Sequence, residues 1–271
     1  HDLYFVWKTN YLNIKCVQFK RYGEDKLGYS IFEGMNDEII YEDLATNNLA
    51  YQIKILNRLG MLGFIKEVKF DSKKVVTRAE FAQALCGFYT DSVDGNEEYF
   101  YDLPAKHSKA KYVNYMYQRG IIEMTADKHF RPDTIITVEQ ALNLIKKIYN
   151  MPKNNSKLVK QAEKNLETQI MSGVSSKRSG ELTRQDLARM LSNAIEARYM
   201  TYTIIDGNEP GMNYTEGILK ETREIDKTYG TVSAIPSTSL SNVESGISNG
   251  WVMIGDTLYS DPKNLAQKYL G

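Results

Sequence analysis

The chain has few cysteines and no long apolar run, and both scarcities narrow what it can be. Cys16 and Cys86 are its two cysteines, and two thiols so far apart give neither a disulfide framework nor the ligand spacing of a metal site. A single disulfide between them stays open, but Cys86 lies on an apolar helical stripe, where a buried free thiol is the commoner outcome. No stretch reaches the length of a membrane-spanning helix, and no signal peptide is visible, so we expect no insertion into a membrane.

Net charge is also lacking. The 34 Lys and Arg residues cancel the 34 Asp and Glu residues, so no global field attracts nucleic acid or an anionic membrane, and we expect neither as a partner. The sequence shows no glycine-rich phosphate loop, nucleophile elbow or paired His-Glu motif. His107 and His129 have no Cys or His at ligand spacing. We therefore expect no catalytic residue, no metal and no cofactor, and the chain is predicted not to be an enzyme.

What the chain does contain is one short motif three times. Residues 77–80 (Thr-Arg-Ala-Glu) return as 137–140 (Thr-Val-Glu-Gln) and as 183–186 (Thr-Arg-Gln-Asp). The copies begin 60 and then 46 residues apart, and the first two each follow a glycine, Gly60 or Gly120, by 17 residues. Units of this size cannot each bury a core, so the repetition predicts tandem units that stack. Such arrays point towards binding or anchoring before they point towards catalysis.

Each unit is predicted to be a helix, a loop and a second helix. The first helix should end at Gly60 or Gly120, where a left-handed C-cap is expected. Its apolar face holds Ala50, Ile53, Leu56 and Leu59 in the first unit, and Ala110, Val113 and Met116 in the second. The second helix should begin at a capping box, with Thr77 as the cap and Glu80 at N3. Gln140 and Asp186 take the N3 place in the other units. The inward residues expected in the second helices are Phe81, Leu85, Phe88, Ala141, Ile145, Ile148, Leu187, Leu191 and Ala194.

The segments outside the repeats are predicted to be β-rich. Leu12, Ile14 and Cys16 show the alternation of a half-buried strand, and a partner strand is expected near 29–32. Past residue 199, a strand is predicted over 230–235, and 251–259 predicts a hairpin with a two-residue turn. A loop is expected over 237–248 and a short closing helix over 262–270. The predicted fold class is therefore α+β.

The middle region resembles the S-layer homology domain of bacterial cell-surface proteins. That family's repeat runs from an aromatic-Asp-Val start through Gly-Ile-Ile and Phe-x-Pro-Asp to Ile-Thr-Arg-Ala-Glu. The second unit is similar at 100–104 (Phe-Tyr-Asp-Leu-Pro), 120–122 (Gly-Ile-Ile), 130–133 (Phe-Arg-Pro-Asp) and 136–137 (Ile-Thr). The first unit is similar at 41–44 (Tyr-Glu-Asp-Leu), 60–62 (Gly-Met-Leu) and 76–80 (Val-Thr-Arg-Ala-Glu), and the third is shortened.

The resemblance implies three repeats arranged as a pseudo-trimeric helical bundle. Its repeats would span 41–97, 98–152 and 153–198, the last of them degenerate, with β-rich modules at 1–40 and 199–271. It also implies grooves that bind secondary cell-wall polysaccharide, often through a pyruvylated amino sugar whose carboxylate the motif arginine grips. The carbohydrate-binding residues implied here are Arg78, Arg184, Thr77, Thr183 and Glu80. The implied location is secreted, at the cell surface or cell wall of a bacterium.

The residues supply their own argument for the two arginines. Arg78 and Arg184 fall at N1, the first helical position, where a cation opposes the helix dipole by about 0.3–1 kcal/mol. An anion bound at the helix N-terminus would give a reason for this placement. Free amides point at such an anion, and a guanidinium can hold a carboxylate with two parallel hydrogen bonds. The alternative is an ion pair with an Asp or Glu of the neighbouring repeat.

Departures from the family pattern leave three hypotheses. Val138 replaces the arginine of the second unit, and Ser108 follows His107 where the family has Trp. One groove should therefore bind its ligand weakly or not at all, and an aromatic ring that could stack on a sugar is lost. The leading hypothesis is non-covalent anchoring of a surface protein to wall polysaccharide. The second is a self-assembling S-layer or filament subunit, with copies of itself as partners and the repeats as packing units. The third is a surface enzyme that carries anchor repeats.

Overall fold

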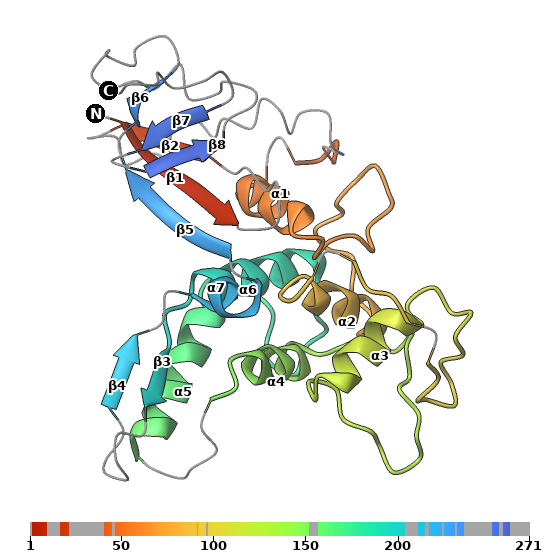
Figure 1. Cartoon of the computed structure of the whole chain (residues 1–271). Coiled ribbons are helices and arrows are strands. Elements are labelled where there is room, and N and C mark those ends of the chain that lie inside the picture. Colours follow the sequence, from red (N-terminus) through yellow and green to blue (C-terminus); the bar gives the residue numbers. More distant parts are fainter. Residues whose placement is uncertain are drawn as a thin grey trace. The chain divides into compact units, whose positions relative to one another are not determined.

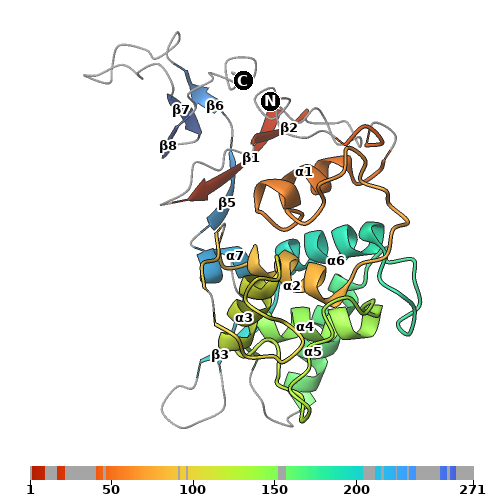
Figure 2. The same cartoon turned by 90° about the vertical axis from the view of Figure 1, so that its right-hand side faces the viewer.

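The structure is a computed structural model. It describes residues 2–9, 17–21, 41–44, 47–90, 92–95, 97–151, 157–203, 211–214, 217–223, 225–230, 232–235, 251–254 and 257–260. Helices and strands are both present, so the chain is α+β as predicted (Figures 1 and 2). The chain divides into two compact units, Tyr41–Arg223 and a second one that joins His1–Ile40 to Glu224–Gly271.

The Tyr41–Arg223 unit contains the three copies of the motif. The helices ahead of the motifs are α1 (Ala50–Arg58), α3 (Ala110–Gln118) and α5 (Lys157–Ile170). The helices that the motifs open are α2 (Arg78–Cys86), α4 (Val138–Ile148) and α6 (Arg184–Glu196). A hairpin of β3 (Met200–Thr203) and β4 (Gly211–Tyr214) and the helix α7 (Ile218–Arg223) follow. The helices predicted around Ala50 and Ala110 and after each motif threonine are therefore confirmed.

Helices of successive repeats pack on one another in a circle. The helix α3 contacts α2, α5 contacts α4, and α1 contacts α6 (Figure 1). The loops that lead into the motif helices follow the same order. Isolated β-bridges join Thr77 to Ile135, Thr137 to Glu181, and Val75 to Thr183. Because the third unit reaches back to the first, each unit is covered by a neighbour, as units too small to bury a core alone require.

The circle extends into the first turn of each motif helix. Two amides of that turn donate to carbonyls in the loop of the next repeat, and the pairing is the same in all three places. The bonds run from Arg78 and Ala79 to Thr134 and Pro132, from Val138 and Glu139 to Gly180 and Arg178, and from Arg184 and Gln185 to Lys74 and Ser72. Helix starts normally leave these amides without intrahelical partners. Here they join the repeats together.

The predicted caps are present. The Thr77 side chain accepts from the Glu80 amide while the Glu80 side chain accepts from the Thr77 amide, which is a full capping box. Thr137 and Gln140 form the second box in the same way. Thr183 accepts from the Asp186 amide, but the Asp186 carboxylate turns to other donors instead of completing a box.

The helix ends follow the sequence equally well. Gly60 and Gly120 have φ of 75° and 71°, the left-handed conformation expected of them. After α1, the Gly60 amide donates to Asn57 and the Met61 amide to Leu56, which is the Schellman pattern of hydrogen bonds. A residue with a Cβ pays a steric cost at such a φ, so glycine stops the helix here.

The inward faces of the motif helices form a large part of the core of this unit. All nine residues predicted to point inward from them are buried, and Phe81, Ala141 and Leu187 have no exposed surface. Cys86 is a buried free thiol, which confirms the commoner of its two expected states. Burial raises the pKa of that thiol far above its ordinary value.

The other unit consists of short antiparallel sheets. One places β1 (Asp2–Thr9) between β2 (Val17–Arg21) and β5 (Ile225–Gly230). The second has the order β6 (Val232–Ala234), β7 (Trp251–Ile254) and β8 (Thr257–Ser260). Ile254 pairs directly with Thr257, so the hairpin with a two-residue turn is confirmed.

Some of the other predictions for the outer segments are corrected, and others concern residues that the structure does not describe. The strand expected over 230–235 is the end of β5 followed by β6. The strand expected around Leu12–Cys16, its partner near 29–32, the loop over 237–248 and the helix over 262–270 lie outside the described residues. The helical unit extends to Arg223, so β3, β4 and α7 lie with the repeats and not with the residues beyond 223. The repeat boundaries at 97/98 and 152/153 stay predictions.

Candidate ligand groove at Arg78

Both predicted arginines stand at N1, but the helix starts around them differ from the sequence-based picture. The amides of Arg78 and Ala79 donate to loop carbonyls of the next repeat, and the Glu80 amide donates to Thr77 Oγ1 at 3.2 Å. The α6 start is paired in the same way. Free amides at these helix starts were part of the argument for an anion site, and that part is wrong. What a ligand can use is the arginine side chain itself.

The Arg184 side chain already has partners within the protein. Its side chain is 2% exposed, and its Nη2 donates to Glu67 Oε1 at 3.0 Å and to Oε2 at 3.2 Å. Its Nη1 donates to the Phe70 carbonyl at 2.9 Å. This is the ion pair with a neighbouring repeat that stood as the alternative to ligand binding. Glu67 was not identified from the sequence, because it lies 117 residues from Arg184 and no local pattern connects the two.

Arg78 makes the equivalent backbone contact without the ion pair. Its Nε donates to the Phe130 carbonyl at 2.9 Å, and its Cζ lies 4.8 Å from the centre of the Phe130 ring. Within the described part of the chain, no carboxylate forms an ion pair with Arg78. Partial burial, and then the positive charge of Arg131, lower the pKa of Arg78 below its ordinary value. A guanidinium still carries its charge under those conditions, so this cation is available to a ligand.

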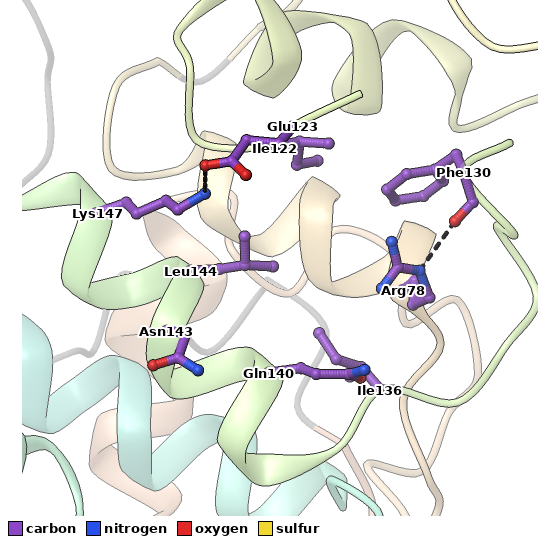
Figure 3. Close-up of a pocket in the computed structure, with 9 residues that line it drawn as sticks. All are labelled: Arg78, Ile122, Glu123, Phe130, Ile136, Gln140, Asn143, Leu144 and Lys147. Atoms are coloured by element: carbon purple, nitrogen blue, oxygen red, sulfur yellow. Dashed lines mark hydrogen bonds and ion pairs between the residues drawn. The ribbon is translucent and has the colours of Figure 1, made fainter. Parts of the chain in front are cut away.

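Arg78 borders a pocket of about 200 Å³ (Figure 3). The apolar side of the pocket is formed by Ile122, Phe130, Ile136 and Leu144, and the polar side chains around it are Arg78, Glu123, Gln140, Asn143 and Lys147. Arg78 comes from α2, whereas every other lining residue belongs to the second predicted repeat. The pocket therefore lies where Arg78 of the first predicted repeat meets the second.

A second cation lies across the pocket. Lys147 Nζ donates to Glu123 Oε1 at 2.7 Å and to the Ile121 carbonyl at 3.2 Å (Figure 3). Because Lys147 is paired with Glu123, Arg78 is the lining cation that forms no ion pair among the described residues, although the charge of Asp102 acts on it. A pocket with one unpaired guanidinium, an amide-bearing helix face and an apolar wall fits a small acidic group on a mostly neutral molecule.

The remaining predicted site residues have structural roles. Thr77 and Thr183 cap their helices, and Glu80 completes the first capping box. Their polar groups are used within the chain, so binding of carbohydrate by these three residues stays a prediction. Val138, which takes the arginine position in the second repeat, has no exposed surface. It is a packing residue, as expected for a groove that has lost its arginine.

Two aspartates that were not among the predicted site residues shape the loops beside both arginines. Asp102 accepts from the amides of Phe130 and Arg131, and Asp43 accepts from the amides of Phe70 and Asp71. Although burial opposes it, these amide bonds lower the pKa of Asp43 below its usual value. The aromatic-x-Asp start shared by both units was the signal that could have identified them.

Other candidate chemistry is absent from the described residues. No group of His, Cys, Asp and Glu there could hold a metal ion. His107 accepts from the Lys109 amide, and His129 lies beside Asp127, so both histidines belong to local turns. Of the helices in the described segments, none has both the length and the apolar character that crossing a membrane requires.

Comparison with known proteins singles out the region that supplies most of this pocket. Residues 99–142 match the S-layer homology domain family. No curated protein matches the chain. The resemblance seen in the sequence is thereby confirmed for the second repeat. S-layer homology domains anchor proteins at the cell surface or cell wall, so this chain carries a module of a cell-surface or cell-wall protein.

Proposed function

We propose that this chain, through its S-layer homology domain at 99–142, holds a bacterial surface protein non-covalently on secondary cell-wall polysaccharide. The ligand we propose is an acidic sugar of that polymer, a pyruvylated amino sugar, with its carboxylate on Arg78. The role is binding and not catalysis. The repeats at 41–198 then form a pseudo-trimeric bundle, which the circular packing of their helices supports.

The observation that carries this proposal is the unpaired guanidinium at the pocket. Arg78 is half-buried and has no carboxylate partner among the described residues, whereas Arg184, at the same motif position, has Glu67. A half-buried cation that forms no ion pair gains most from a ligand that brings a carboxylate to it. The apolar wall beside it, with Phe130 and Ile122, suits the ring or methyl face of a sugar derivative.

The test is retention on purified cell walls. Arg78→Met keeps an unbranched apolar stem against the Phe130 ring and removes the charge. We expect about a ten- to hundredfold loss of affinity, because a charge-assisted hydrogen bond contributes about 1.5–3 kcal/mol. Arg119→Met is the matched control, since Arg119 also lies over aromatic rings, those of Tyr89 and Tyr115, but does not line the pocket.

The ligand is tested with walls from which mild acid has removed the pyruvyl ketals. Binding of the parent should fall to the level of Arg78→Met, while Arg78→Met itself should be insensitive to the treatment. Equal retention of parent and Arg78→Met on untreated walls would remove the carbohydrate role from this pocket.

A second candidate function is self-assembly into an S-layer or filament. The observation that favours it is that two of the three motif positions serve packing, since Val138 is fully buried and Arg184 is held by Glu67. Electron microscopy of the chain without polysaccharide tests it. Ordered arrays that also form with Arg78→Met would favour this role, and a monomer at high concentration would count against it.

A further inference from the structure

We infer that Glu67 occupies the place of a ligand's carboxylate in a second groove, so that the Arg184 groove is closed by the protein's own side chain and only the Arg78 groove is open. Removing Glu67 should expose a second site for small carboxylates. That this site would take the same acidic sugar as Arg78 rests on the proposed function.

The two arginines have matching surroundings up to the point where Glu67 enters. Each stands at N1 after a capping threonine, and each donates at 2.9 Å to the carbonyl of a loop phenylalanine, Phe130 for Arg78 and Phe70 for Arg184. That phenylalanine is held in both loops by an aspartate that accepts its amide. Arg78 uses Nε for this bond and Arg184 uses Nη1, so the two guanidinium groups lie against the same loop carbonyl through different nitrogens, and at Arg184 a carboxylate is added.

The carboxylate comes from a position that both repeats share. Glu67 precedes Phe70 by three residues, and Asp127 precedes Phe130 by three. Glu67 bonds Arg184 and Lys74, and its side chain is 45% exposed, so its outer side faces solvent. Asp127 instead pairs with Arg131, which is four residues further along its own loop. The residue that corresponds to Arg131 in the first repeat is Asp71, which cannot hold Glu67 away from Arg184.

Two buried polar groups beside Glu67 have no partner. Arg184 Nε and the Tyr41 hydroxyl are both buried and form no hydrogen bond within the part of the chain that the structure describes. Burial raises the pKa of Tyr41 to about 12. The charge of Arg184 lowers this pKa and the charge of Glu67 raises it, so the three groups lie close together. Buried polar groups normally have hydrogen-bond partners. A site that served only the internal ion pair would therefore be expected to provide partners for these two groups. The Glu67 carboxylate uses one nitrogen of the guanidinium and leaves Nε idle, whereas a free carboxylate can approach two nitrogens together.

The first experiment uses acetate as the probe and does not depend on any sugar. Glu67→Ala should unfold at a lower temperature than the parent, and acetate should restore part of the loss while chloride at the same ionic strength does not. The parent should not respond, and Glu67→Ala/Arg184→Met should lose the response. Glu67→Ser, whose short side chain also leaves the place of the carboxylate empty, repeats the test if the alanine variant folds poorly. An acetate response no larger than that of chloride in both variants would overturn the inference.

The second experiment counts binding sites for a pyruvylated amino-sugar disaccharide by calorimetry. We expect one site in the parent, none in Arg78→Met, and one again in Arg78→Met/Glu67→Ala. A site that survives Arg78→Met in the parent background and disappears with Arg184→Met would overturn the inference, because the groove would then be open with Glu67 in place. If acetate acts as expected but no variant binds the disaccharide, the closed site stands and the proposed function fails.

A reciprocal variant tests whether a loop acid can also close the groove at Arg78. Asp127→Glu/Arg131→Asp gives the second loop the residues of the first, and it should weaken binding at Arg78 by about tenfold or more, as expected when a charge-assisted bond is taken by an internal partner. Arg131→Asp with Asp127→Asn is its control, because it makes the same change at 131 but leaves no carboxylate at 127. Equal binding by these two double variants would contradict the role given to the loop acid.

Discussion

Arg78 and Arg184 begin the same motif in two repeats, and they end in different surroundings. Both follow a capping threonine, and both donate to the carbonyl of a loop phenylalanine. Arg184 is then neutralised by Glu67 and buried, whereas Arg78 borders a pocket and has no ion pair among the described residues. The difference comes from the loop of the adjacent repeat and not from the motif itself.

This contrast shows how one motif can serve stability in one repeat and recognition in another. The pairing of helix-start amides with the next loop is the same in all three repeats, so the frame does not depend on the arginine. Val138 confirms this, because the frame is kept where the arginine is absent. The arginine position is therefore free to diverge, and its partner decides its role.

The largest expected effect is on stability at Arg184. Arg184→Met removes the charge-assisted bonds to Glu67 and to the Phe70 carbonyl and leaves Glu67 with Lys74 as its ion-pair partner, so we expect the free energy of unfolding to fall by about 3 kcal/mol. Arg78→Met loses the bond to the Phe130 carbonyl but no ion pair, so it should cost less, about 1.5 kcal/mol. Urea unfolding followed by circular dichroism measures both. Equal losses would mean that the two arginines do not differ as their surroundings indicate.

The next largest effect is a difference in stability between substitutions of the two N3 acids, Asp186 and Glu80. Asp186 is buried and accepts from the amides and hydroxyls of Ser175 and Ser176 as well as from Thr183. Asp186→Ala leaves these donors without their acceptor, and we expect the free energy of unfolding to fall by about 2–3 kcal/mol. Glu80→Ala removes one half of a capping box and should cost about 1 kcal/mol. If thermal unfolding ranks Glu80→Ala as the more damaging change, the third repeat is less dependent on its N3 acid than we infer.

The smallest effect is a pH dependence carried by the closed groove. The hydrogen bond from Lys74, with a further contribution from Arg184, lowers the pKa of Glu67 from 4.5 to about 2 although burial opposes it. A carboxyl whose pKa is depressed on folding contributes stability above its unfolded pKa and loses it as the pH falls through the folded value. That contribution should therefore decline between about pH 4.5 and about pH 2.

Melting temperatures across this pH range provide the measurement. Glu67→Gln should flatten the decline, because the variant has no carboxyl at that position to titrate. Glu123→Gln, a change in the open groove where the acid pairs with Lys147, serves as the control. An unchanged slope with Glu67→Gln would show that the Glu67 ion pair does not contribute to acid stability.

Local features of this chain were predictable because each depends on a few neighbouring residues. The capping threonines Thr77 and Thr137, the left-handed glycine Gly60 and the hairpin turn after Ile254 are set by side-chain and backbone chemistry within a few positions. The buried faces of the motif helices followed from a period of 3.6 residues. The resemblance of the second repeat to the S-layer homology domain rested on several such short motifs at fixed spacing.

The candidate site was predictable only in part. The sequence placed Arg78 and Arg184 at N1 correctly, but it could not show that the amides there are used by the next repeat. It also could not distinguish the open arginine from the closed one. Glu67 is 117 residues from Arg184 in the chain, and no local pattern connects them.

The sequence by itself determined the elements: where the motif helices begin, which faces they bury and which residues stop them. These depend on short-range propensity and hydrogen bonding, which a few residues specify. Only the tertiary structure decided which arginine is free, because that depends on which loop acid lies within ion-pair distance after the third repeat has returned to the first. The distance between two charges is a property of the packed chain, and it makes Arg184 part of the fold and Arg78 the candidate for a ligand.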